Sequence, residues 1–183
     1  VSDHGFSKVD TEINLYRAFI DAGLIVLDSN GKIKSWEASP WNSGGSSAIV
    51  LARQNDAALK ARVAGLLAQL KADPKNCIAE IAEPAEIARI GGNPDASFYI
   101  SYAPNAYAGG FKGPSAPLVS PSGSKGMHGY FPHSPLMRSS FMMMGKGVPK
   151  GRSLGEIDMR AIAPTLAKIL GAKLPDAEMP PVQ

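Results

Sequence analysis

A stripe of aliphatic side chains near the middle of the sequence constrains the fold more than any other feature. The stripe consists of Leu59, Val63, Leu66, Leu67 and Leu70. These positions recur at three- and four-residue spacing, which places them on one face of a helix over residues 56–71. Asp73-Pro74 follows directly and predicts the end of the helix, because proline disfavours helical geometry in the residue before it.

Strand-like segments lie on both sides of this helix. Residues 24–28 and 32–36 flank Asn30-Gly31, a pair typical of tight turns, and predict a β-hairpin. Other apolar runs predict strands over residues 47–52, 77–81, 97–103 and 139–144. In the last of these, Met142-Met143-Met144 is interpreted as part of a core strand, since methionine fills irregular apolar gaps.

Three further helices are predicted over residues 10–22, 84–90 and 162–170. The first is followed by Gly23 and the last by Gly171, and glycine commonly ends helices. Helices that alternate with strands favour an α/β architecture with a partly parallel sheet. At 183 residues the chain has the length of one domain, so residues 1–183 are predicted to form a single domain.

Residues 105–125 are rich in serine, proline and glycine and show almost no periodicity. Loops of this length are usually functional or mobile. Tyr102, Asn105 and Tyr107 border the segment and are candidates to line a substrate cleft, with surface packing as the alternative interpretation.

Composition limits the possible functions. Apolar residues make up 44% and charged residues 19%, as in ordinary globular proteins. The formal charge is +3 and the basic residues are scattered, which argues against a nucleic-acid polymer as partner. No apolar window of about 18 residues is present, so no membrane span is predicted. The single cysteine, Cys77, excludes an internal disulfide and is interpreted as an inert core residue.

The three histidines carry the chemical information. Two of them are followed by glycine, in Asp3-His4-Gly5 and Met127-His128-Gly129. Glycine lets the backbone approach an ion closely, and imidazole together with carboxylate suits zinc and similar divalent metals. The alternative is that these are loop histidines that form hydrogen bonds with the backbone. His133 lies between two prolines and is interpreted as a loop residue without a ligand role.

Three blocks of the sequence form a recognisable series. They are Ser2-Asp3-His4-Gly5, then Gly126-Met127-His128-Gly129-Tyr130 with Pro132, and finally residues 157–171. In this order they resemble the alkaline phosphatase superfamily, in its type I phosphodiesterase/nucleotide pyrophosphatase branch. The resemblance covers essentially the whole chain. It implies the C-terminal part of an alkaline-phosphatase-like mixed sheet flanked by helices, with a small inserted α+β subdomain.

The resemblance also implies a function and a set of ligands. Asp3 and His4 would bind one ion of a two-metal site, and His128 would bind the other; the ions are expected to be zinc. Such a pair holds phosphate oxygens and stabilises the leaving group. The implied activity is hydrolysis of phosphodiester or pyrophosphate bonds in a small phosphodiester or nucleotide, through a phosphorylated Thr or Ser. The sequence leaves the compartment open; because many relatives are exported, a periplasmic or extracellular location is preferred.

The chain lacks part of what this family uses. A pair of zinc ions needs about six protein ligands, and only three are present. The family's nucleophile and remaining ligands precede the Ser-Asp-His-Gly block, so we expect this sequence to be the incomplete C-terminal portion of a catalytic domain whose N-terminal part is its partner. Ser46, Ser47 and Thr165 are rejected as nucleophiles because the first two enter a strand and the third packs in the last helix.

Three alternatives stay open at this stage. A relative acting on phosphomonoesters or phosphonates would use a similar site. A sulfatase is disfavoured because that branch lacks the late histidine block. The third alternative is a folded but non-catalytic fragment, which we expect the isolated chain to be.

Overall fold

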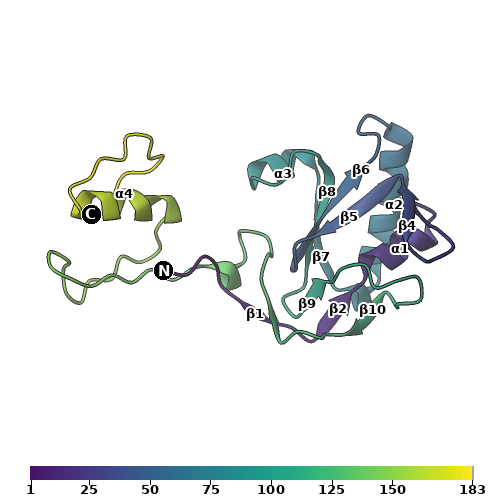
Figure 1. Cartoon of the computed structure of the whole chain (residues 1–183), viewed down its shortest axis with the longest axis horizontal. Coiled ribbons are helices and arrows are strands. Elements are labelled where there is room, and N and C mark those ends of the chain that lie inside the picture. Colours follow the sequence, from purple (N-terminus) through teal and green to yellow (C-terminus); the bar gives the residue numbers. More distant parts are fainter. Residues whose placement is uncertain (183) are drawn as a thin grey trace. The chain divides into compact units, whose positions relative to one another are not determined.

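The computed structural model describes residues 1–182 and divides the chain into two compact units. The first is Val1–Ser140, and the second begins at Phe141 (Figure 1). The described residues combine several small sheets with the helices α1 to α4, so the predicted α/β class is confirmed. No helix among them is long and apolar enough to cross a membrane.

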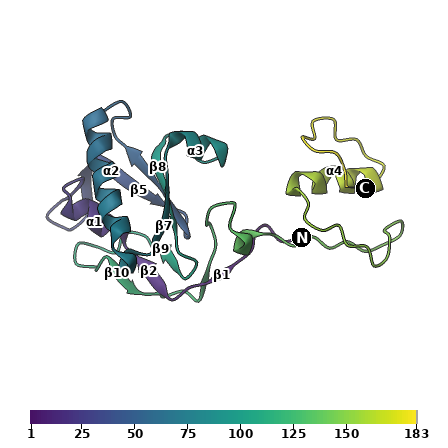
Figure 2. The ribbon, with the colours of Figure 1, turned by 180° about the vertical axis from the view of Figure 1, so that it is seen from behind.

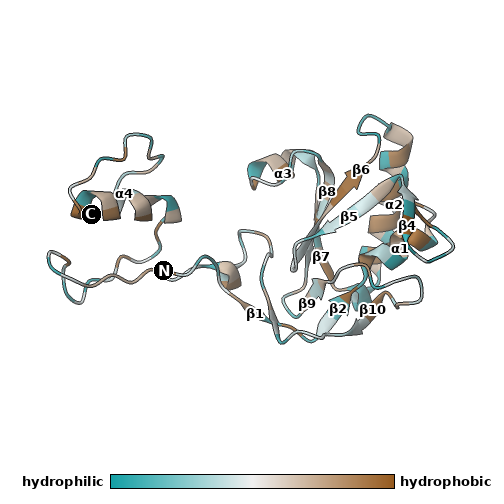
Figure 3. Ribbon diagram, viewed as in Figure 1, coloured by the Kyte–Doolittle hydropathy of each residue, from teal (hydrophilic) through white to brown (hydrophobic). Residues whose placement is uncertain are grey.

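The largest sheet of the first unit has four antiparallel strands in the order β5-β6-β8-β7. Their bounds are Ala38–Asn42 for β5, Ser46–Leu51 for β6, Ile78–Ala82 for β7 and Ala96–Tyr102 for β8. Every residue of β6 is buried, and Figure 3 shows its hydrophobic colouring. The predicted strands over 47–52, 77–81 and 97–103 are therefore confirmed, with shifts of one residue.

Helix α2 (Ala57–Ala72) lies across one face of this sheet (Figure 2). Its stripe residues Leu59, Val63 and Leu67 join one core cluster with Ile49 of β6, as the sequence spacing predicted. Asp56 caps the helix by accepting a hydrogen bond from the Leu59 amide at 2.8 Å. The helix therefore forms because its apolar face has a sheet to cover it.

The opposite face of the sheet is covered by smaller elements. Helix α3 (Pro84–Arg89) places Ile87 in a second core cluster with Ala48 and Phe131. Because Ala48 and Ile49 are adjacent in β6, their side chains point to opposite faces, and each belongs to a different cluster. Phe131 brings the segment after His128 onto this face.

Three short strands form a separate sheet in the order β10-β2-β9. Strand β2 (Thr11–Ile13) pairs in parallel with β9 (Ala106–Ala108) and antiparallel with β10 (Val119–Pro121). Two predictions are corrected here. The first helix, α1, spans only Leu15–Asp21, because the residues before it are used as a strand. The segment 105–125 is not a continuous loop, since β9 and β10 find their partners in β2.

The hairpin predicted around Asn30-Gly31 is confirmed. Strands β3 (Ile25–Leu27) and β4 (Ile33–Trp36) pair antiparallel, and Gly31 has a φ of 74° in the turn. Strands β1 (Ser7–Lys8) and β11 (Gly126–Met127) form another antiparallel pair, which is the one that positions the candidate site. The 3-10 helices η1 (Pro74–Asn76) and η2 (Pro135–Met137) complete the first unit.

The second unit contains η3 (Met159–Ala161) and α4 (Ile162–Ile169). The predicted last helix is confirmed, and Gly171 follows it with a φ of 69°. The predicted strand over 139–144 is wrong: these residues are irregular, and the side chains of Met142 and Met144 are 86% and 93% exposed. An apolar run alone does not make a strand where no neighbouring strand is available to pair with it.

Candidate metal site

The β1–β11 ribbon brings together the two histidine blocks. Its register pairs Ser7 with Met127 and Lys8 with Gly126. Because the strands are antiparallel, His4, which precedes β1, and His128, which follows β11, lie at the same end of the ribbon. The imidazole rings of His4 and His128 are stacked, with centroids 3.9 Å apart and ring planes 7° apart. The two motifs therefore lie side by side, as the resemblance implied for residues of one two-metal site.

Alternation along the ribbon explains why both rings lie on its outer face. Side chains of successive strand residues point to opposite sides. Ser7 and Val9 point inward and are buried, and the Ser7 hydroxyl donates to the Pro104 carbonyl at 2.6 Å. His4 and Phe6 consequently point outward, as does His128 across from them. The site is therefore open to ligands from solution.

Hydrogen bonds fix the orientation and tautomer of His4. Its Nδ1 lies 2.8 Å from the Gly5 carbonyl oxygen, which can only accept, so Nδ1 carries the proton. This leaves the Nε2 lone pair available, and Nε2 lies 3.4 Å from Oδ2 of Asp3. The other Asp3 oxygen accepts the His4 backbone amide at 3.1 Å. The Asp3 side chain is 86% exposed, so its carboxylate can turn toward a bound ion.

The glycine after each histidine is required by close packing against protein backbone. A Cβ at Gly5 would lie 1.9 Å from the Leu136 carbonyl oxygen, and one at Gly129 would lie 1.9 Å from the Ser43 carbonyl oxygen. Gly129 also has a φ of 82°, where other residues are strained. These glycines thus hold the two histidine loops against the rest of the unit.

Tyr130 anchors the segment that carries His128. Its ring lies over Gly45, where a Cβ would approach ring atoms to within 2.4 Å. Its hydroxyl is 2.8 Å from the Ala106 carbonyl oxygen, and burial raises the pKa of Tyr130 to about 12. The backbone amide of Gly45 in turn donates to the His128 carbonyl at 2.8 Å. His128 therefore has a fixed backbone while its ring is exposed.

The donor set fits divalent metal in its chemistry, although it is small. Asp3 offers carboxylate oxygens and His4 an oriented imidazole nitrogen, the ligand types that zinc accepts. The two imidazole rings are near-parallel with centroids 3.9 Å apart, so in this arrangement they do not face a single common ion. Over residues 1–182, no group of three or more His, Cys, Asp or Glu is arranged to hold one ion.

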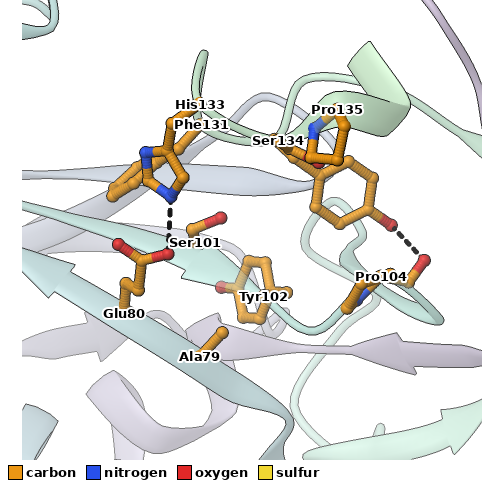
Figure 4. A pocket seen from close by; sticks show the side chains of 10 residues that line it. Ala79, Glu80, Ser101, Tyr102, Pro104, Phe131, His133, Ser134 and Pro135 are labelled. Carbon is orange, nitrogen blue, oxygen red and sulfur yellow. Dashed lines mark hydrogen bonds and ion pairs between the residues drawn. The ribbon is translucent and has the colours of Figure 1, made fainter.

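The third histidine, His133, is one of the residues that line a cavity of about 200 Å³ on the first unit (Figure 4). His133 Nε2 lies 2.8 Å from Oε1 of Glu80, and both side chains are half exposed. Tyr102 lines the cavity, as the sequence suggested for a cleft. The pairing of His133 with Glu80 was not predicted, because nothing in the sequence indicates that the loop returns to β7.

The remaining candidates have structural roles. Ser46 and Ser47 lie buried in β6, and the Thr165 hydroxyl donates to the Ala161 carbonyl at 2.6 Å. Tyr107 does not line the cavity of His133: it is packed in the interior, and its hydroxyl donates to the buried Glu12 at 3.0 Å, which fits the alternative of a packing role. Cys77 is only partly buried rather than a full core residue, and burial raises the pKa of its thiol.

Asn105 donates to Asp10 at 3.1 Å and does not line the cavity of His133.

Comparison of the chain with protein-family models, with curated proteins and with solved structures found no match.

Proposed function

We propose that this chain supplies part of the metal site of a hydrolase that cleaves phosphodiester or pyrophosphate bonds. Asp3 and His4 hold one divalent ion, expected to be zinc, and His128 holds the second. The observation that carries the proposal is the stacking of His4 on His128, because two blocks from opposite ends of the first unit meet at one exposed point. The kind of reaction is inferred from the three sequence blocks, whose order resembles that of the phosphodiesterase/nucleotide pyrophosphatase branch.

The residues of this chain would orient the metal ligands and offset part of the positive charge of the ions. The Gly5 carbonyl holds the proton of His4 on Nδ1 and so presents Nε2 outward. Asp3 adds one negative charge and offsets part of the charge that a metal pair would bring. When bound, the ions would polarise the phosphoryl oxygens of the substrate. Neutral imidazoles leave enough positive charge to attract a phosphate group.

The proposal places the nucleophile, a Thr or Ser, and the remaining ligands in an N-terminal part outside this chain. Of the hydroxyls that the sequence offered as substitutes, Ser46 and Ser47 are buried in β6, and that of Thr165 donates to the Ala161 carbonyl just before α4. A nucleophile must be activated and aimed at phosphorus, and none of these three is free to do so. The small phosphodiester or nucleotide substrate would therefore bind between the two parts.

The test is hydrolysis of a nitrophenyl phosphodiester, with zinc or manganese, by a protein that joins this chain to the required N-terminal part. His128→Ala should lower the rate by orders of magnitude, because positioning and metal charge supply most of the barrier reduction in phosphoryl transfer. His133→Ala is the matched control and should change the rate little. Equal and mild effects of the two substitutions would contradict the proposed ligands.

A further inference from the structure

Phe6 is a large apolar side chain that stays 62% exposed next to the histidine pair. Its ring centroid lies 6.1 Å from that of His4 and 5.7 Å from that of His128, with interplanar angles of 20° and 28°. The three rings therefore form one stacked group on the outer face of the ribbon.

The register of the ribbon explains where the Phe6 ring lies. Continuing the pairing of Ser7 with Met127 places Phe6 across from His128, with Gly126 as its diagonal neighbour on the same face. A Cβ at Gly126 would lie 2.5 Å from Cε1 and 2.6 Å from Cδ1 of Phe6. The ring thus covers the backbone of Gly126, which is possible only because this position has no side chain.

This arrangement leaves the space beside His128 to the ring of His4. His4 is two residues before Phe6 and points to the same face, so its ring reaches His128 from beyond the end of the paired strands. A larger residue at position 126 would lift Phe6 from the ribbon and into the space of the histidines. With glycine at this position, both imidazoles have the Phe6 ring beside them on the same face of the ribbon.

We propose that Phe6, seated on Gly126, is a positioning residue that sets the spacing of the His4 and His128 rings. The inference rests on the proposed function in treating the two histidines as metal ligands. Phe6 itself touches no ion in this account; it acts through the two rings. Groups that orient metal ligands typically change metal affinity by about 10-fold to 100-fold when they are removed.

Nuclear Overhauser effects between imidazole protons of His4 and His128 test the spacing in the metal-free chain. The wild type should show a cross-peak between the two rings. Phe6→Leu should weaken or remove it, whereas Phe6→Tyr should retain it because the aromatic ring is kept. Phe111→Leu is the matched control: it removes a ring that contacts Tyr16 instead, and the cross-peak should persist.

Zinc affinity provides the second readout. Phe6→Leu should bind zinc about 10-fold more weakly than the wild type, and Phe6→Tyr should bind within about 2-fold of it. Gly126→Ala should weaken zinc binding to a similar extent as Phe6→Leu, because the added Cβ displaces the Phe6 ring from the backbone of residue 126. Dispersed amide resonances in each variant establish that it is folded.

An unchanged His4–His128 cross-peak in both Phe6→Leu and Gly126→Ala would overturn the inference, as would unchanged zinc affinity when the cross-peak is lost. A wild-type chain that binds no zinc would count against the proposed function instead. In that case the cross-peaks still decide whether Phe6 sets the ring spacing.

Discussion

The imidazole ring of His4 lies 3.9 Å from that of His128 and almost parallel to it. The two residues come from opposite ends of the first unit and are joined by the β1–β11 ribbon. Parallel rings at this distance direct their nitrogens into neighbouring planes rather than toward one common point. One ion shared by both histidines would therefore require at least one of the rings to turn.

Gly129→Ala should destabilise the first unit strongly. The residue has a φ of 82°, and a Cβ would lie 1.9 Å from the Ser43 carbonyl oxygen. Strain in this backbone region and the steric clash together should cost at least about 2 kcal/mol in the free energy of unfolding, measured by urea denaturation. Gly123→Ala is the control, because a Cβ there meets no atom within 4 Å. Similar stabilities of the two variants would contradict this packing.

Tyr130→Phe should make stability less dependent on pH in alkaline solution. Burial raises the pKa of Tyr130 to about 12 in the folded chain, whereas an exposed tyrosine has a pKa near 10. The contribution of this raised pKa to the free energy of unfolding is fully present below about pH 10 and is lost as the pH rises from about 10 to 12. The variant should lack this part of the decline. At neutral pH it should be about 1 kcal/mol less stable, because the hydrogen bond to Ala106 is lost.

Urea denaturation at a series of pH values between 7 and 11 measures both effects. The raised pKa of Tyr102, which has the same cause, contributes equally to both proteins and serves as an internal reference. An identical alkaline decline in wild type and Tyr130→Phe would mean that Tyr130 is not the group responsible.

The local elements were largely predictable because their signals are local. The aliphatic stripe of α2, the Asn30-Gly31 turn and the glycine after α4 each act over a few residues. Strands β2, β9 and β10 were missed because each is three residues long and forms only through pairing with distant segments. The strand predicted over residues 139–144 was wrong because the apolar run around Met142 has no neighbouring strand to pair with.

The site was predictable in part for the same reason. His4 and His128 share a visible His-Gly pattern, and the resemblance of their blocks predicted that they would meet. The packing of Phe6 on Gly126 was missed because it depends on strand register, which places the two residues diagonally across from each other. The contact between His133 and Glu80 was missed because neither residue carries a pattern that points to the other.

The isolated chain should show no hydrolysis of a nitrophenyl phosphodiester above the background of zinc or manganese alone. The proposed two-metal site would take only three ligands from this chain, and the candidate hydroxyls at Ser46, Ser47 and Thr165 are buried. If the proposed mechanism holds, a site without its nucleophile and half of its ligands cannot carry out the covalent step at all. Turnover that survives purification and disappears in Ser47→Ala would show that the nucleophile lies within this chain.

Zinc titration of the 15N-labelled chain tests the metal assignment most directly. Zinc should bind weakly, shift the imidazole resonances of His4 and His128, and leave those of His133 unchanged. His128→Ala should weaken the zinc affinity at least about 10-fold, and His133→Ala should not change it. Shifts confined to His133, or equal zinc affinities of wild type and His128→Ala, would contradict the assignment.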